Sequence, residues 1–211
     1  ILSNVPVIDR VKAIEWQHPR KGRPPLPAQV KGYDESFNLI NCVDFGRKVW
    51  ARPRADNFCL ACNVVPPEKF SMPQLQITPE QQKFALDVVT ANFVTGSKVV
   101  GCFLSSHGDC RIWSIKRWKK LAKKREDCTF IWFSDNPAHQ DIKSPQNVIN
   151  TSNMLSFEEF LALLSICDRI LCPDTSGMHL AEMLHTPCTV LEGSTNVKFH
   201  TKYYNHVSSL R

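Results

Sequence analysis

The residues best suited to chemistry lie at positions 174–179, where an acid, two hydroxyl residues, a glycine and a histidine are grouped as Asp174-Thr175-Ser176-Gly177-Met178-His179. They follow a short apolar run that ends in proline, and a helix is predicted to begin among them. The first turn of a helix has unpaired backbone N–H groups and the positive end of the helix dipole, which together bind phosphate. The histidine falls one turn inside this helix and can face the same ligand. The ordinary alternative is a helix capped by Asp174 or Thr175, with a buried histidine.

Two further loops carry side chains suited to phosphate. Ser105, Ser106 and Arg111 follow an apolar run at 98–104, and residues 193–195 (Gly-Ser-Thr) follow another at 188–191. Arginine can hold phosphate oxygens in a bidentate fork. Each loop alone is typical of an ordinary polar turn, but together with residues 174–179 they favour a phosphate-bearing ligand.

The elements that must position these loops alternate regularly from residue 77 onward. Helices are predicted to begin at the capping boxes Thr78–Gln81 and Ser156–Glu159, at Ser114, and after Asp174. Between them lie short apolar runs typical of buried strands, at 98–104, 128–133, 148–150, 169–172 and 188–191. This alternation predicts an α/β fold with a parallel sheet covered by helices on both faces. Ligands of such sheets bind beyond the carboxyl ends of the strands.

The first 76 residues are less regular than the rest of the chain. Strands are predicted at 11–16 and 36–42 and a helix at 55–63, with a basic, proline-rich loop at 18–25. These are too few units for a complete α/β domain. We therefore predict two parts, 1–76 and 77–211.

The bulk composition is that of a globular protein, with 43% hydrophobic residues among 211. A net charge of +6 favours an anionic partner only weakly. No apolar run reaches the roughly 18 residues of a membrane span, and the amino terminus does not resemble a signal peptide. The nine cysteines have no framework spacing, which predicts reduced thiols in a cytosolic protein. Cys59 and Cys62 form a C-x-x-C pair, for which burial in a helix is favoured over metal or redox chemistry.

Residues 111–125 form a basic stretch with two interleaved tryptophans. Its cations are Arg111, Lys116, Arg117, Lys119, Lys120, Lys123, Lys124 and Arg125. Nucleic-acid binding is one interpretation. The spacing places Trp118 on the apolar side and the lysines on the other, which favours an ordinary solvated helix.

Four groups of residues, in this order, resemble the carboxyl half of the heptosyltransferase-type glycosyltransferases. They are Arg111-x-Trp113-x₄-Trp118-x₂-Leu121-Ala122, Leu155-Ser156-x₂-Glu159-Phe160-x-Ala162-Leu163-Leu164, the run 174–181, and Thr186-Pro187 with residues 193–195. Residues 4–11, 33–39 and 54–58 resemble the later part of that family's acceptor-side domain more loosely. The family comprises the ADP-heptose:lipopolysaccharide heptosyltransferases and their relatives, which have a GT-B fold.

The resemblance implies a nucleotide-sugar held between two α/β domains, with 1–76 as a partial, shortened acceptor-side domain and 77–211 as the donor-binding domain. The implied reaction moves a sugar, heptose among the candidates, from a nucleotide diphosphate to an acceptor hydroxyl, with inversion and without a metal or cofactor. An ADP-sugar is the favoured donor. The residues implied to hold the donor phosphates are Ser105, Ser106, Arg111, Asp174, Thr175, Ser176, Gly177 and His179. Positive charge there would stabilise the departing diphosphate.

The sequence departs from the family pattern at several positions. The family's amino-terminal strand and Gly-rich turn, with the acid taken as general base, have no counterpart, so we expect the chain to begin after them. His107 is then the candidate base. Arg111 stands where lysine is usual, and Ser176 where glycine is commoner. The loop after residue 133 lacks the usual nucleoside-contacting pattern, which leaves Asp135 as the candidate acid for the ribose.

The expected partners are a nucleotide-sugar and an anionic glycan or lipid-linked acceptor, at a cytoplasmic location peripheral to the inner membrane. Basic residues on the acceptor side that could meet such an acceptor are Arg20, Lys21, Arg23, Arg47, Lys48, Arg52 and Arg54. One alternative is a non-catalytic nucleotide-sugar-binding protein, or half of an enzyme that a partner chain completes. Another is a nucleic-acid-modifying glycosyltransferase or nucleic-acid binder, suggested by residues 111–125.

Overall fold

The structure is a computed structural model that describes residues 52–70, 72–92, 98–106 and 109–211. The predicted strands at 11–16 and 36–42, the basic loop at 18–25 and His107 lie outside the described residues. The chain divides into two compact units, one of Ile1–Phe70 with Lys198–Tyr203 and one of Ser71–Val197 with Tyr204–Arg211. Each unit is described by itself below.

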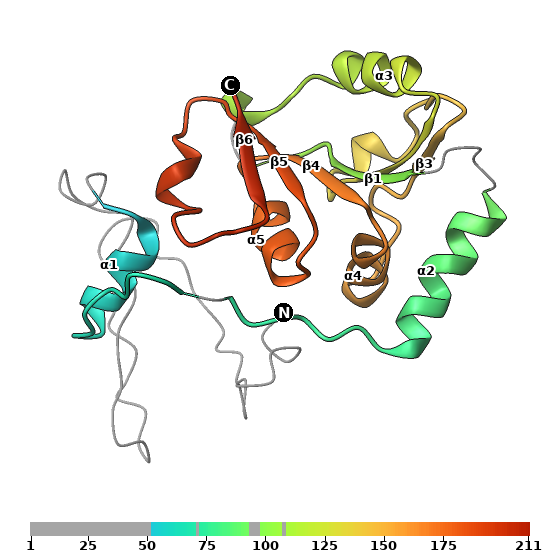
Figure 1. The fold of residues 1–211 in the computed structure, drawn as a ribbon. Helices are drawn as coiled ribbons and strands as arrows, with labels where there is room; N and C mark the ends of the chain where they lie inside the picture. The colour runs from blue at the N-terminus through green and yellow to red at the C-terminus, as the bar shows by residue number, and fades with distance from the viewer. Residues whose placement is uncertain (1–51, 71, 93–97, 107–108) are drawn as a thin grey trace, which may run out of the picture. The chain divides into compact units, whose positions relative to one another are not determined.

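The second unit is built on a six-stranded sheet in which every neighbouring pair is parallel (Figure 1). Its strands are β1 (Lys98–Phe103), β2 (Cys128–Phe133), β3 (Val148–Asn150), β4 (Arg169–Pro173), β5 (Cys188–Leu191) and β6 (Val207–Leu210). The five strands predicted from apolar runs are confirmed to within a residue or so. The prediction missed β6, because its Val-Ser-Ser-Leu sequence is half polar and lies largely exposed at a sheet edge.

The strand order is β3-β2-β1-β4-β5-β6. β2 and β3 are added on one side of β1, and β4, β5 and β6 on the other side, so the strand order reverses between β1 and β4. β1 pairs with β2 on one side and with β4 on the other. The loops after β1 and β4 therefore leave neighbouring strands at the reversal point. In open α/β sheets this is where ligands bind.

Helices cover both faces of the sheet, as predicted (Figure 1). α3 (Ile115–Lys124) lies on one face, and α4 (Phe157–Ser165) and α5 (Ser176–Met183) lie on the other, with α2 (Pro79–Ala91) packed beside α4. Both predicted capping boxes are present. Thr78 Oγ1 accepts from the backbone N–H of Gln81 at 3.3 Å, and Ser156 Oγ accepts from that of Glu159 at 3.2 Å. The predicted α/β fold, a parallel sheet covered by helices on both faces, is therefore confirmed for this unit.

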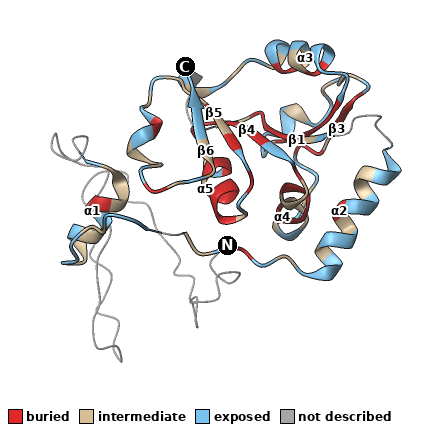
Figure 2. Ribbon diagram, viewed as in Figure 1, coloured by how far each residue is buried: buried red, intermediate tan, exposed pale blue. Residues whose placement is uncertain are grey.

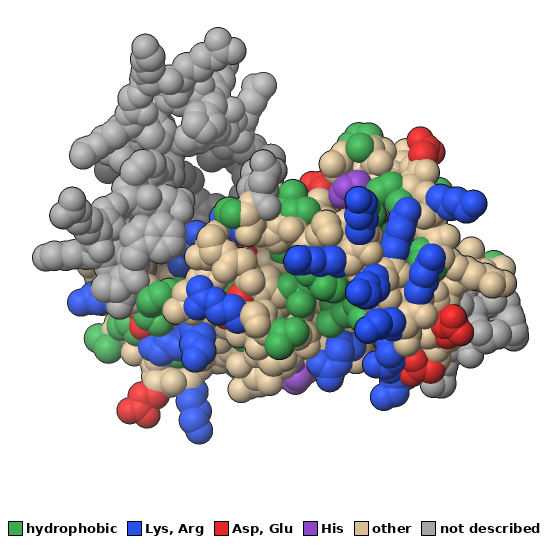
Figure 3. Space-filling model, turned by 90° about the horizontal axis from the view of Figure 1, so that it is seen from above, with side chains coloured by type: hydrophobic (Ala, Val, Ile, Leu, Met, Phe, Trp, Pro, Cys, Tyr) green, Lys and Arg blue, Asp and Glu red, His purple; other side chains and the backbone are tan. Residues whose placement is uncertain are grey.

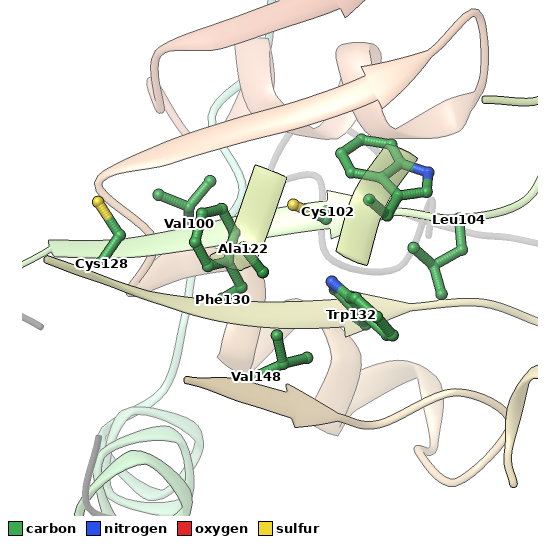
Figure 4. Packing of buried hydrophobic residues seen from close by; sticks show 9 residues of the cluster. Val100, Cys102, Leu104, Ala122, Cys128, Phe130, Trp132 and Val148 are labelled. Atoms are coloured by element: carbon green, nitrogen blue, oxygen red, sulfur yellow. The ribbon is translucent and has the colours of Figure 1, made fainter. Parts of the chain in front are cut away.

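The core beneath α3 consists of alternate residues of the inner strands (Figure 4). Val100 and Cys102 of β1 and Phe130 and Trp132 of β2 point to this face. Trp118 of α3 packs on them and is only 1% exposed, while most of the lysines of the helix are exposed. Figure 2 shows the resulting contrast between the buried strands and the solvated side of α3. The predicted apolar position of Trp118 is confirmed.

The opposite face holds an aromatic cluster that fixes α4 and α5. The ring centroid of Phe160 on α4 lies 5.8 Å from that of Phe103 and 5.2 Å from that of Phe133. Gly177 of α5 lies directly on Phe103, since a Cβ added there would be 2.8 Å from the ring. The beginning of α5 is thus held against the end of β1 by close packing.

The described part of the first unit contains α1 (Arg54–Ala61) and a buried polar cluster. The carboxylate of Asp56 accepts hydrogen bonds from Lys202 Nζ at 2.8 Å and from the Tyr203 hydroxyl at 2.6 Å. The prediction that Cys59 and Cys62 are buried in apolar packing is wrong. Both are half-buried free thiols, because α1 buries Asp56 and not its apolar residues.

Candidate functional site

Three loops meet around Asp174, the residue that follows β4. Its side chain is 4% exposed, and Oδ2 accepts a hydrogen bond from Thr195 Oγ1 at 2.7 Å. Arg111 Nη1, in the 3₁₀ helix η3 (Asp109–Arg111), lies 3.3 Å from the same oxygen. Ser106 Oγ donates to the backbone carbonyl of Asp174 at 2.8 Å. The loops after β1, β4 and β5 are therefore joined through one buried acid.

The start of α5 lies directly beside this acid. Thr175 is the N-cap residue, with an extended backbone (φ −153°), and its side chain makes no capping hydrogen bond. The carboxylate of Asp174 is turned to Thr195 and Arg111. In the ordinary alternative, the side chain of Asp174 or Thr175 caps the helix and the histidine is satisfied within the protein. The structure has no such cap, but it does have the hydrogen-bonded histidine, His179. The backbone N–H groups of Ser176 and Gly177 remain at an uncapped helix start, which is the arrangement that favours an anion.

A close backbone approach holds η3 against the loop after β5. A Cβ added to Gly193 would lie 2.4 Å from the backbone carbonyl oxygen of Cys110. Ser194 Oγ donates to Cys110 Sγ at 3.1 Å across the same contact. Only glycine fits this approach, and the contact fixes the residue next to Arg111. The side chain of Arg111 is one third exposed, so its guanidinium reaches solvent beside the helix start.

The two serines after β1 use their hydroxyl protons within the protein. Ser105 Oγ donates to Asp135 Oδ1 at 2.8 Å, and Ser106 Oγ donates to Asp174 as described. In this arrangement neither hydroxyl has a proton left for a phosphate oxygen. Among the described residues, other donors at this edge include the guanidinium of Arg111, the hydroxyl of Thr175 and the backbone N–H groups at the start of α5. Asp135, the candidate ribose acid, lies exposed at the end of β2.

The loop that carries Asp135 also contains a serine–histidine contact. Ser134 Oγ lies 2.8 Å from His139 Nδ1, at the end of the 3₁₀ helix η4 (Pro137–His139). Burial lowers the pKa of His139, and the negative charge of Asp135 only partly offsets that effect. The neutral imidazole is therefore the favoured form here.

His179 is half-buried on α5, and its Nδ1 is hydrogen-bonded to the hydroxyl of Tyr204. Burial, and then the negative charge of Glu182, raise the pKa of Tyr204 to about 12. Glu182 is itself buried and accepts the backbone N–H groups of Asn205 and His206 at 2.9 and 2.8 Å. Tyr204 and Glu182 were missed from the sequence, because their contacts join α5 to a segment more than 20 residues away, which no local pattern indicates.

The predicted site residues thus fall into three groups. Arg111, Ser106 and Asp174 lie together beside the start of α5, which contains Thr175, Ser176 and Gly177. Ser105 and Asp135 form a second pair. His179, one turn inside α5, is hydrogen-bonded to Tyr204 from the segment before β6. His107 lies outside the described residues. Among the residues that the structure describes, no group of three or more His, Cys, Asp or Glu side chains could hold a metal ion.

The fold and this strand-end arrangement define the class of protein, an α/β chain of the GT-B type. The sequence matches the family model of glycosyltransferase family 9 (heptosyltransferase) over residues 56–211, and the chain belongs to that family. The predicted resemblance is confirmed. No curated protein sequence matches the chain.

Several solved structures share the fold. The ADP-heptose LPS heptosyltransferase II of E. coli has a TM-score of 0.58 and 18% identity, covering 69% of this chain and 47% of that one. A family 9 glycosyl transferase of Veillonella parvula DSM 2008 has a TM-score of 0.61 and 17% identity, covering 75% and 49%. E. coli heptosyltransferase WaaC with ADP has a TM-score of 0.50 and 16% identity, covering 74% and 48%. The chain therefore spans about half the length of these structures. None of the helices that the structure describes is long and apolar enough to cross a membrane.

Proposed function

We propose that this chain binds the diphosphate of a nucleotide-sugar and takes part in transfer of the sugar to an acceptor hydroxyl. Family membership supports glycosyl transfer as the reaction class. An ADP-sugar is the favoured donor, because one similar structure is a complex with ADP and another a complex with ADP-2-deoxy-2-fluoro heptose. The identity of the transferred sugar, with heptose among the candidates, and the nature of the acceptor also belong to the proposal.

The observation that carries the proposal is the contact of Arg111 with Asp174 beside the uncapped start of α5. The guanidinium has five N–H donors, and the contact with Asp174 takes only those on one side. The remaining donors can bind phosphate oxygens while the carboxylate holds the side chain in place. An ionised carboxylate accepts hydrogen bonds but donates none. We therefore assign Asp174 to positioning Arg111 and Thr195, and the phosphates to Arg111, Thr175 and the N–H groups of Ser176 and Gly177.

In the proposed reaction the acceptor oxygen attacks the anomeric carbon of the sugar as the bond from that carbon to the diphosphate oxygen breaks. The sugar configuration inverts, and the nucleotide diphosphate leaves with one additional negative charge. Arg111 and the positive end of α5 stabilise that charge, which is the electrostatic contribution expected of preorganised donors. The acceptor proton passes to a base, and His107 remains the proposed base. Since no metal is needed in this scheme, transfer should persist in the presence of a chelator.

The remaining expectations belong to the same proposal. Asp135 would contact the ribose, with Ser105 orienting its carboxylate at 2.8 Å. The acceptor would be an anionic glycan or lipid-linked sugar at the cytoplasmic side of the inner membrane. Of the basic residues proposed to meet it, the described ones are Arg52, which is exposed, and Arg54, which is half-buried.

Calorimetric titration with ADP tests the site directly. We expect Arg111→Ala to weaken ADP binding by roughly 10- to 100-fold, because hydrogen bonds to charged groups contribute about 1.5–3 kcal/mol. Arg111→Lys should recover part of the loss, since it restores the charge without the fork. His179→Ala should also weaken binding, because we propose that His179, one turn inside α5, faces the same phosphates.

The matched control is Arg125→Ala, which removes an arginine that also pairs with an aspartate, Asp127, but at an exposed position. This variant should bind ADP like the unaltered protein. Unchanged affinity in both Arg111→Ala and His179→Ala would defeat the site assignment. Donor binding without hydrolysis or transfer, even at high protein concentration, would favour the non-catalytic or half-enzyme alternative.

A further inference from the structure

The outward side of α3 is a surface of basic side chains. Lys116, Arg117, Lys120, Lys123 and Lys124 are all exposed, and the helix contains no acidic residue. At about 100° per residue these five positions fall within an arc of roughly 120°. We call this set the α3 basic face. Figure 3, which looks at the molecule from the side of α3, shows Lys and Arg side chains gathered over the helix with apolar atoms between them.

This charge is held on a rigid support. Trp118 and Ala122 anchor the helix in the sheet core, being 1% and 0% exposed. At the helix end, Asn147 Nδ2 lies 3.0 Å from the carbonyl oxygen of Ala122 and 3.1 Å from that of Arg125. Within the part of the chain that the structure describes, no carboxylate pairs with a cation of the α3 basic face. Among the described residues, the positive charge of the face is therefore not balanced by an ion pair, and the helix that carries it is anchored in the core.

The chemistry of the face favours a lipid surface over nucleic acid. Proteins that bind single strands stack bases on exposed aromatic rings. Here Trp118 is buried, and Trp113 is half-buried. The two rings pack edge to face, with their centroids 4.7 Å apart.

An anionic bilayer needs only positive charge arranged on one side of a rigid element, and it also accepts apolar side chains at the edge of that charge. Figure 3 shows apolar side chains beside the Lys and Arg side chains of this surface. The charge of the face and these apolar side chains fit the same partner.

We propose that the α3 basic face docks the protein on an anionic phospholipid surface. Because the apolar side of α3 is already buried in the core, the helix does not insert, and the attachment is mainly electrostatic. This inference rests on the surface of α3 alone and is independent of the proposed sugar transfer.

The test is co-sedimentation of the full chain with phosphatidylcholine vesicles, with and without phosphatidylglycerol. We expect binding only to the anionic vesicles, falling steeply as salt is added. Replacing two lysines of the face (Lys120→Gln with Lys124→Gln) should weaken binding by about 25-fold, taking roughly fivefold for each cation removed. ADP affinity of this variant should be unchanged.

The matched control replaces two exposed lysines elsewhere in the same unit (Lys83→Gln with Lys98→Gln), so that the net charge changes equally. It should keep full vesicle binding. Equal losses in the two variants would mean that only net charge matters and would overturn the proposal. Equal binding to uncharged vesicles, or duplex DNA binding that outcompetes the anionic vesicles, would also overturn it. Circular dichroism confirms that each variant is folded.

Discussion

Arg111 and Arg125, at the two ends of the basic stretch 111–125, each pair with an aspartate. The two pairs differ in sequence separation, distance and burial. Arg125 and Asp127 are two residues apart, 2.8 Å from each other and more than half exposed. Arg111 and Asp174 come from different loops and are 3.3 Å apart, and the carboxylate is only 4% exposed. The closer pair is local and solvated. The longer one joins two strand ends.

The comparison shows why distance alone does not identify an important ion pair. The hydrogen bond from Arg125 lowers the pKa of Asp127 to about 2, yet both groups remain in water, where such pairs contribute little. The carboxylate of Asp174 is almost completely shielded from water. It accepts a hydrogen bond from Thr195 and also faces Arg111. Removing a partner from such a buried arrangement leaves polar groups unsatisfied, and that is costly.

The largest effect is expected from Asp174→Ala. We expect the free energy of unfolding to fall by about 1.5–3 kcal/mol, because the hydrogen bonds that join the three loops are lost. ADP binding should fall at least as far as in Arg111→Ala. Denaturant unfolding and calorimetry measure the two quantities. Asp127→Ala is the matched control and should leave both unchanged, and equal destabilisation by the two substitutions would break the comparison.

A smaller effect is expected from Gly193→Ala, which tests whether the loops around Asp174 can shift to make room for a side chain. The added Cβ would meet the Cys110 carbonyl oxygen at 2.4 Å, and backbone atoms cannot rotate away. We expect a loss of about 1–3 kcal/mol in stability and weaker ADP binding, since η3 must move and Arg111 with it. Ser194→Ala, at the next residue, adds no atoms and removes only the hydroxyl contact with Cys110 Sγ, so it should have a much smaller effect on both quantities. A Gly193→Ala protein with normal ADP affinity would show that the position of η3 does not matter for the ligand.

The smallest effect concerns Tyr204, another contact made between distant parts of the chain. Its pKa is raised from about 10 to about 12, so its contribution to stability is full below pH 10 and is lost as the pH rises through 12. Unaltered protein should therefore lose stability over that range more steeply than Tyr204→Phe. Thermal melts at neutral and alkaline pH give the comparison. Parallel pH profiles for the two proteins would contradict the burial of this hydroxyl.

Much of the fold could be predicted from local patterns. Five strands and both capping boxes followed from apolar runs and from short-range hydrogen bonding, which depend on neighbours in sequence. β6 could not be found in this way, because its edge position demands little apolar burial. The same limit hid Tyr204 and Glu182, whose roles come from contacts between α5 and the segment before β6.

The candidate site shows the same difference between what local patterns predict and what only the fold decides. The types and order of Arg111, Asp174 and Thr175, each placed just after an apolar run, were enough to predict a phosphate site at the carboxyl edge of a parallel sheet. Only the tertiary structure decided that Asp174 faces inward to hold Arg111 and Thr195, and that the hydroxyls of Ser105 and Ser106 are already used. Sequence patterns report which elements form, because that depends on periodic burial and local hydrogen bonds. The direction of each polar side chain depends on which partners the fold brings within about 3 Å, and no local pattern contains that information.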